Sequence, residues 1–344
     1  MQQPSRNNLP SFPSILAACL LVFASIPAHS QEYTSIVVFG DSLSDSGNDA
    51  HLYQQKYGFR LPGVNFDYAD GRFTNGYETI PGAQNYVGTW VEQLAAALPS
   101  KPKIKASLDG GTNYSYGFAT TGDGLGYLFY DIQGVTYSVY VSNIGQQITD
   151  YLATNPKMNG KTLFIVWGGG IDLLYATSPF DIPVAADNQA HNVQRLVDAG
   201  ATDIMVANLP ALGLIPRLNG SPLSADPANA ASAAFNYFLD QGLDGVVKNS
   251  PGQPLHLYRL DIFTLFNQMV ASPSSFSLTN VTGTSQGMIG LNPDTYLFWD
   301  DIHPTTKGFN IVALTAAKLL DSKKCWGYVW PYPLAESERS CAVK

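Results

Sequence analysis

Residues 35–48 read SIVVFGDSLSDSGN, and this stretch decides which fold the rest of the chain can adopt. Its first five residues form a short apolar run that ends at Gly40, which indicates a strand buried on both faces. Further runs of this kind alternate with helical patterns along the chain. Strands separated by helices pair in parallel through right-handed crossovers. The sequence therefore predicts one three-layer α/β/α domain over residues 31–344, with a central parallel sheet.

The predicted elements are spaced evenly enough to fill such a domain. Further strands are expected at residues 162–167, 203–207 and 255–260, and helices at residues 86–98, 144–152, 192–199, 228–247 and 305–320. Two segments rich in Gly, Pro, Ser, Thr and Asn, residues 54–84 and 272–298, interrupt the alternation. They are long for connections in a compact domain, so we expect them to build a site.

Composition and charge exclude several classes of function. The 344 residues are 45% hydrophobic and carry a formal net charge of −8. An acidic chain without a Lys/Arg cluster is a poor partner for nucleic acid or an anionic membrane. The sequence contains neither an HExxH motif nor paired Cys/His spacing, so a catalytic metal is not expected.

The two ends of the chain indicate export. Residues 1–30 combine a polar start, an apolar stretch and small residues before Gln31, which predicts a secretory signal peptide. Lipidation at Cys19 is the alternative. Cys325 and Cys341 are the cysteines left after cleavage, and in an exported protein they are expected to form a disulfide worth about 3 kcal/mol. We therefore expect a secreted or periplasmic protein whose tail is tied by this disulfide and which has no further membrane span.

Candidate catalytic residues come from opposite ends of the chain. Ligands bind at the carboxyl ends of parallel strands, and Ser42 follows the first strand there. A serine needs a base to become a nucleophile. In FWDDIHPTTKGF, residues 298–309, Asp300 precedes His303 by three positions and can orient its imidazole toward a serine, while Asp301 should project elsewhere. The alternatives are a polar turn at the serine and a polar helix start at the histidine.

A second serine motif is a decoy. Residues 283–287 read GTSQG, which matches the G-x-S-x-G pattern around a nucleophilic serine. That pattern requires a strand before it and a helix after it. Polar loop residues precede Ser285 here, so we interpret the match as accidental and the segment as a flexible loop.

Taken together, the motifs resemble those of the GDSL, or SGNH, hydrolases. The resemblance rests on FGDSLSDSGN (residues 39–48), GRFTNG (71–76) followed by Trp90, NLPALGLIP (208–216) and DDIHP (300–304). It implies a secreted or periplasmic esterase or lipase with a flavodoxin-like fold.

By resemblance Ser42 is the nucleophile, His303 the general base and then acid, and Asp300 the residue that orients it. The resemblance implies that the reaction would proceed through an acyl-enzyme and that no cofactor would take part. The substrate would be a small-molecule, lipid or carbohydrate ester, and the enzyme is expected to act as a monomer.

The same family stabilises the developing oxyanion with three donors. These are the backbone N–H of the serine, the N–H of a glycine in a second block and an asparagine side chain in a third. The second block resembles residues 111–119, where Gly117 is the candidate and Phe118 stands where the motif usually has another glycine. In the third block Ile171 occupies the asparagine position, and its side chain cannot donate a hydrogen bond.

Several consequences of this departure stay open from the sequence. The hole could work with two donors, or another group could replace the asparagine, such as the N–H of Gly169 or Gly170 or an amide from Asn143 or Asn208. A domain that binds an acyl or glycan ligand without turnover is an alternative, as is an acyltransferase whose loops exclude water. The complete serine, histidine and aspartate set favours an active hydrolase.

Overall fold

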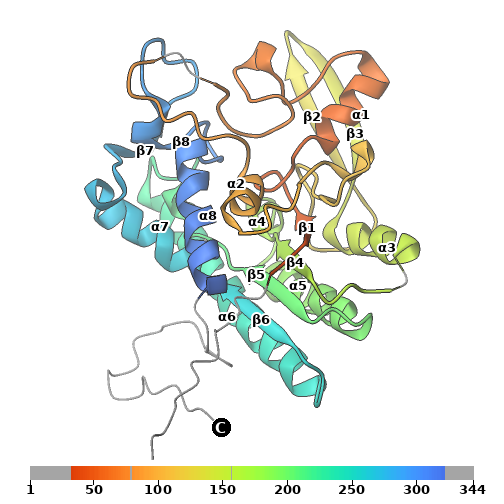
Figure 1. Ribbon diagram of the computed structural model, residues 1–344. Helices are drawn as coiled ribbons and strands as arrows, with labels where there is room; N and C mark the ends of the chain where they lie inside the picture. The colour runs from red at the N-terminus through yellow and green to blue at the C-terminus, as the bar shows by residue number, and fades with distance from the viewer. Residues whose placement is uncertain (1–31, 78–79, 156, 322–344) are drawn as a thin grey trace, which may run out of the picture.

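The centre of the molecule is a parallel sheet of four strands in the order β1-β4-β5-β6 (Figure 1). The structure is a computed structural model that describes residues 32–77, 80–155 and 157–321. The strands are β1 Ser35–Gly40, β4 Thr162–Trp167, β5 Asp203–Ala207 and β6 His256–Leu260. All three pairings are parallel, so the predicted α/β class and its four central strands are confirmed.

Helices cover both faces of this sheet. One layer contains α2 Trp90–Ala97, α7 Ile262–Ala271 and α8 Thr306–Asp321, and the other contains α3 Ile144–Thr154, α5 Asp181–Asp198 and α6 Pro222–Asn249 (Figure 1). In β1, Ile36 and Val38 pack against the first layer, whereas Val37 and Phe39 pack against the second. Since successive side chains of a strand point to opposite faces, an entirely apolar strand needs both layers.

The helix boundaries differ from the prediction where capping decides them. Helix α2 begins at Trp90 and not at residue 86, because Thr89 and Glu92 form a capping box there. Helix α6 begins at Pro222, six residues before the predicted start, because Ser221 accepts a hydrogen bond from the N–H of Leu223. Helix α5 begins eleven residues before the predicted residue 192.

Several elements outside the sheet are not predicted from the sequence. They are α1 Asn48–Tyr57, the antiparallel hairpin of β2 Leu125–Ile132 and β3 Val135–Ser142, the short helix α4 Gly170–Leu174, and the pair β7 Asn280–Thr284 and β8 Tyr296–Phe298. Single 3-10 turns lie at Val64–Phe66, Ser107–Asp109, Leu212–Leu214, Pro273–Phe276 and Pro293–Thr295.

The hairpin escapes prediction because both of its faces carry aromatic residues. Its inner residues Leu128, Val139 and Val141 form an apolar cluster with Tyr53 of α1. Its outer face exposes Tyr127, Phe129 and Tyr140. A strand with apolar side chains on both faces lacks the alternating pattern that marks a half-buried strand. The β2–β3 hairpin and helix α1 lie side by side at the top of Figure 1.

A short segment extends the sheet on the free side of β1. The N–H of Val38 donates to Thr112 (3.0 Å), the N–H of Tyr114 donates to Val38 (2.8 Å), and the N–H of Tyr116 donates to Gly40 (3.3 Å). The segment runs parallel to β1, and these hydrogen bonds place residues 112–118 beside the carboxyl end of the strand. The segment expected to supply an oxyanion donor therefore lies next to the serine loop.

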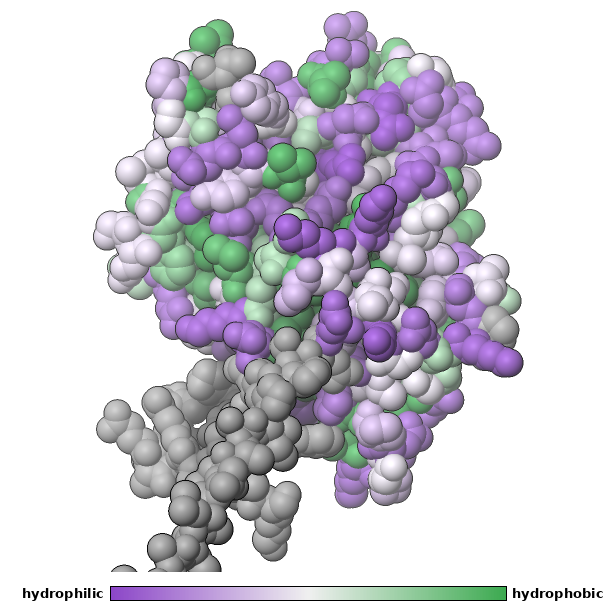
Figure 2. All heavy atoms as spheres, viewed as in Figure 1, coloured by the Kyte–Doolittle hydropathy of each residue, from purple (hydrophilic) through white to green (hydrophobic). Residues whose placement is uncertain are grey.

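The predictions for the chain ends concern residues outside the described part of the structure. They are the signal peptide over residues 1–30, lipidation at Cys19, and the disulfide between Cys325 and Cys341. Of the helices in the described ranges, none is long and apolar enough to cross a bilayer. On the face drawn in Figure 2, hydrophilic and hydrophobic residues are interspersed.

Candidate active site

Ser42, His303 and Asp300 form one hydrogen-bonded chain at the carboxyl end of β1. The Ser42 Oγ lies 2.8 Å from His303 Nε2, and His303 Nδ1 lies 2.7 Å from Asp300 Oδ2. All three residues are at least nine-tenths buried. The structure thus brings together the three residues selected from the sequence, although 261 positions separate the serine from the histidine. In this arrangement Nε2 can take the serine proton while Asp300 holds the imidazole.

Asp300 is held in its ionised form by hydrogen bonds. Its Oδ1 accepts the N–H groups of Ile302 (2.8 Å) and His303 (2.6 Å), and its Oδ2 accepts the hydroxyl of Tyr68 (2.8 Å). Burial opposes ionisation, but the His303 imidazole and these backbone donors outweigh it and lower the pKa of Asp300 to about 2. The carboxylate is therefore charged throughout the range in which an imidazole can act as a base.

Tyr68 and Phe73 come from the loop predicted to build a site. The Tyr68 hydroxyl reaches Asp300, and the Phe73 ring packs 4.9 Å from the His303 imidazole. The sequence places this loop at the site but does not single out these two residues, because each lies more than 200 positions from its partner. The second predicted loop joins the first where the Gln286 side chain donates to the carbonyl of Phe66.

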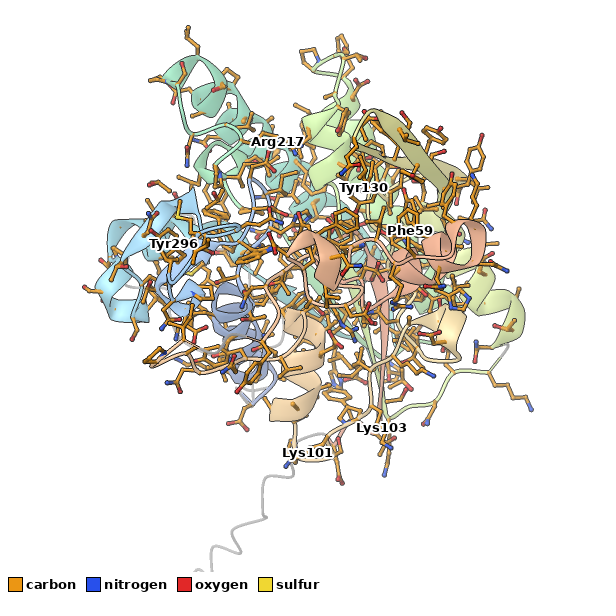
Figure 3. The ribbon with its side chains drawn as sticks, turned by 90° about the horizontal axis from the view of Figure 1, so that it is seen from above. Phe59, Lys101, Lys103, Tyr130, Arg217 and Tyr296 are labelled. Carbon is orange, nitrogen blue, oxygen red and sulfur yellow. The ribbon has the colours of Figure 1, made fainter. Side chains whose placement is uncertain are left out.

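Asp301 points away from the histidine, as the spacing predicts. Its two oxygens accept Nε (2.9 Å) and Nη2 (3.1 Å) of Arg217, and its carbonyl accepts the Arg217 N–H. These contacts between Arg217 and Asp301 hold the turn that carries Asp300 and His303. Arg217 is labelled in the view from above in Figure 3, with Tyr296 of β8 and Tyr130 of the hairpin to either side of it.

The GRFTNG motif supports the histidine turn from the other side. Thr74 Oγ1 donates to the carbonyl of Pro304 (2.9 Å). Asn75 Oδ1 accepts the N–H of Thr306 (2.8 Å), the first residue of α8, and its Nδ2 donates to Thr306 Oγ1 (3.0 Å). Together with the ring of Phe73, these contacts explain why a motif far from His303 in sequence belongs to the same site.

The rest of the FGDSLSDSGN motif ties the serine loop to the neighbouring segment. Asp45 accepts the N–H groups of Gly47, Asn48 and Asp49 and so caps α1. Asn48 Nδ2 then donates to the carbonyls of Asn113 (2.8 Å) and Ser115 (2.9 Å). The serine loop and residues 113–117 are therefore built as one unit.

Gly117, the glycine expected to supply an oxyanion donor, is engaged by a buried side chain. Its N–H donates to the buried Asp49 Oδ2 at 2.9 Å, so it is not free to bind a substrate oxygen. A Cβ at Gly117 would collide with this carboxylate and lie 2.7 Å from the Phe73 ring, which explains the glycine by packing. The next residue, Phe118, has φ 64°. This left-handed conformation favours glycine and costs a larger residue energy.

The three glycines after β4 serve different neighbours. A Cβ at Gly168 would collide with the side chain of Ile144, and one at Gly169 would lie 2.5 Å from the Phe235 ring. Gly169 also has φ 106°, which only glycine adopts without strain. Of the three glycines, only Gly170 lines the apolar pocket beside Ser42. A Cβ built on Gly170 would have Asp41 Oδ2 as its nearest neighbour, at 3.9 Å. The candidate Gly169 thus faces the core and is not among the residues that line the pocket.

The two asparagines considered as substitutes for Ile171 are held elsewhere. Asn143 accepts the N–H of Thr120 (3.0 Å) and donates to the carbonyl of Asp123. Asn208 Oδ1 accepts the N–H groups at the start of α7, and its Nδ2 donates to Asp261. Both amides are therefore used for capping and turns.

An apolar pocket of about 40 Å³ opens beside Ser42. Its lining has two polar side chains, Asp41 and Ser42, and is otherwise glycine and apolar residues: Leu43, Trp167, Gly170, Ile171, Leu174, Leu209, Pro210, Leu212, Ile215, Phe266, Ile302 and Pro304. Much of the NLPALGLIP motif lies in this lining. Burial raises the pKa of Asp41 to about 6, although its carboxylate accepts the N–H of Leu43.

The GTSQG serine is a structural residue. Ser285 is buried, and its hydroxyl donates to the carbonyl of Phe298 at 3.2 Å. Contrary to the expected polar loop, strand β7 precedes it, but turn residues and not a helix follow.

The described ranges contain no group of three or more His, Cys, Asp or Glu side chains arranged to hold a metal ion.

Comparisons with known proteins show which family the chain is similar to. The model of the family described as GDSL-like Lipase/Acylhydrolase matches residues 36–315. An uncharacterized protein in the trpE-trpG intergenic region of Pseudomonas putida is 30% identical over 333 residues, which cover 90% of this chain and 51% of that protein. A GDSL esterase/lipase of Arabidopsis thaliana is 27% identical, with 82% of this chain and 88% of that protein covered.

Some similar proteins are longer or more distant. The anther-specific proline-rich protein APG of Arabidopsis thaliana is 28% identical, and the match covers 81% of this chain and 59% of that protein. A solved structure of a lipolytic G-D-S-L family member from Veillonella parvula matches 83% of this chain and 96% of its own, with 12% identity and a TM-score of 0.40. The family match extends over most of the chain, and the resemblance seen in the sequence is confirmed. The chain belongs to the GDSL-like lipase/acylhydrolase family.

Proposed function

We propose that the protein hydrolyses carboxylic esters through a serine acyl-enzyme. The observation that carries the proposal is the unbroken sequence of contacts from Ser42 Oγ to His303 (2.8 Å) and from His303 to Asp300 (2.7 Å), beside an apolar pocket. Both distances are within the reach that proton transfer requires. Family membership supports the same class of reaction.

The reaction follows from the positions of these atoms. His303 Nε2 takes the Ser42 proton while Oγ attacks the ester carbonyl carbon, and the carbonyl oxygen becomes an oxyanion. His303 then gives the proton to the leaving alkoxide oxygen, and the acyl group stays on Ser42. Water attacks the acyl-enzyme, with His303 again as the base, and the carboxylic acid leaves. Asp300 keeps the imidazole oriented and stabilises its charged form.

The oxyanion is proposed to bind the backbone N–H groups of Ser42 and Phe118. Within the described residues neither N–H donates to a protein acceptor, whereas the N–H of Gly117 is already bonded to Asp49. Phe118 follows Gly117, whose neighbour Phe73 packs on the His303 imidazole, so the segment lies beside the reacting atoms. Its positive φ at a position where the family motif usually has glycine supports this assignment. The hole then works with two backbone donors.

The apolar pocket is proposed to hold the acyl group of the ester. It contains Ser42 in its lining, and apolar side chains surround the space next to the hydroxyl. An acyl chain in such a space gains from apolar burial without leaving polar groups unpaired.

We further propose that the protein is exported through the signal peptide predicted at residues 1–30, that a disulfide joins Cys325 and Cys341, and that it acts as a monomer.

The test compares two serine substitutions in purified protein. Ser42→Ala should abolish hydrolysis of p-nitrophenyl acetate and labelling by a fluorophosphonate probe. Ser285→Ala, the control at the buried GTSQG serine, should keep both. If the native protein neither turns over short esters nor reacts with the probe, the chain is a binding domain and the proposal fails. If acyl groups go to an added alcohol in preference to water, it is an acyltransferase.

A further inference from the structure

Ile171 separates two cavities at the end of β4. The second cavity measures about 270 Å³ and is lined by residues that include Phe118, Asp172, Tyr175 and Asn188. Ile171 is the one residue that lines both this cavity and the serine pocket. Ile171, at the asparagine position of the family motif, therefore forms a wall shared by the serine pocket and this second space.

The serine pocket is small on one side of this wall. A cavity needs at least about 10–15 Å³ for one water-sized group, so about 40 Å³ admits an acyl tail of about three such groups. Acetyl to butyryl groups fit this space, and an octanoyl chain does not. The space on the far side of Ile171 is an open depression of about 270 Å³ that carries both polar and aromatic side chains.

The surroundings of Ile171 restrict the movement of its side chain. Its isoleucine side chain is branched at Cβ, so χ1 rotation is restricted at the start of α4. Its neighbour Asp172 accepts both the N–H (3.0 Å) and the hydroxyl (2.9 Å) of Thr121, which anchors this turn to the segment after Phe118. The wall is thus fixed on a tethered helical turn and does not depend on a loose loop.

We propose that Ile171 determines acyl-chain specificity, restricting the enzyme to short-chain esters by closing the serine pocket against the larger cavity. The proposal rests on the hydrolytic function proposed above. It gives a physical role to a residue that cannot donate to the oxyanion. The site has one donor fewer than the family pattern, and in its place it has an apolar barrier.

The experiment measures kcat/KM for p-nitrophenyl acetate, butyrate and octanoate in Ile171→Ala, Ile171→Val and Ile171→Leu. Removing the wall should raise the octanoate-to-acetate ratio by at least about tenfold in Ile171→Ala, because even one methylene of fit in an apolar pocket changes kcat/KM about tenfold or more. Ile171→Val should shift the ratio less, in the same direction. Ile171→Leu keeps the volume of the side chain and should leave the ratio unchanged.

The matched control is Leu174→Ala, which enlarges the serine pocket without opening it to the second cavity. An equal shift toward octanoate in Leu174→Ala and Ile171→Ala would overturn the proposal, as would an unchanged ratio in folded Ile171→Ala. A shift in Ile171→Leu as large as in Ile171→Ala would also overturn it, because the volume of the side chain would then not govern specificity.

A binding measurement separates this proposal from the hydrolytic function. In the Ser42→Ala background, calorimetry with octanoate should detect tighter binding to the Ile171→Ala variant than to the protein with Ile171. That difference is expected even if the native protein hydrolyses no ester. If octanoate binds both proteins equally, the wall is refuted independently of catalysis.

Discussion

Asp49 provides a direct test of how the oxyanion donors are positioned. The residue is fully buried in the first turn of α1, and its Oδ2 accepts the Gly117 N–H at 2.9 Å. This bond holds the residue immediately before Phe118, whose N–H is proposed to bind the oxyanion. Asp49→Ala removes the acceptor and leaves the Gly117 N–H buried without a partner.

Two magnitudes follow from this loss. A buried donor without an acceptor costs about 1–3 kcal/mol, which should appear as a lower free energy of unfolding. Removal of one oxyanion donor lowers kcat by about 10²–10³, and this sets the upper limit if Phe118 moves out of place. Since the bond acts through Phe118 and does not touch the acyl pocket, KM should change far less than kcat.

Asp49→Asn is the matched control. Burial, together with the neighbouring Asp45 carboxylate, raises the pKa of Asp49 well above its usual range, so a neutral side chain is the closer mimic. Asparagine keeps an oxygen that can accept the Gly117 N–H. This variant should therefore retain kcat within a few-fold and most of the stability lost in Asp49→Ala.

The assay is hydrolysis of p-nitrophenyl acetate at neutral pH, with kcat and KM determined separately, alongside urea unfolding of each variant. A folded Asp49→Ala protein with wild-type kcat would refute the reasoning, because the Gly117 bond would then have no influence on the donors. Equal losses of kcat in the two variants would refute it as well, since charge and not the hydrogen bond would be responsible.

Two further predictions concern stability and pH. Burial raises the pKa of Asp41 from 3.8 to about 6, so the folded state holds this proton more tightly than the unfolded state, and stability falls as pH rises from about 4 past 6. Between pH 4.5 and 7.5 Asp41→Asn should remove about 2 kcal/mol of that fall, measured by urea unfolding at the two pH values; parallel curves for both proteins would contradict this. Tyr68→Phe removes a donor to ionised Asp300 and should lower the free energy of unfolding by about 1.5–3 kcal/mol at pH 7. Because Asp300 has its pKa lowered to about 2, this difference should shrink as pH falls toward 2, and a constant difference would disprove the link.

The central sheet and the three candidate catalytic residues could be predicted from the sequence. Strands β1, β4 and β5 each contain an uninterrupted run of four or five apolar residues, which gives a strong local pattern. The rule that ligands bind at the carboxyl ends of parallel strands then selected Ser42, and the three-residue spacing selected Asp300 with His303.

Contacts between distant segments could not be predicted in this way. Nothing local marks Tyr68 as a partner of Asp300, which lies 232 positions away. The glycine of the second block looked like a free donor, yet packing gives its N–H to Asp49. The hairpin β2–β3 was missed because its aromatic residues lie on both faces.

Ile171 shows what is determined by the sequence and what is determined by the tertiary structure. By itself, the sequence determined that a residue unable to donate a hydrogen bond stands where the family has asparagine, because side-chain chemistry follows from identity alone. Only the tertiary structure decided what that residue does: chain segments brought together by packing place its side chain between two cavities. A cavity is formed by side chains from many distant positions, so no local pattern along the chain can specify it.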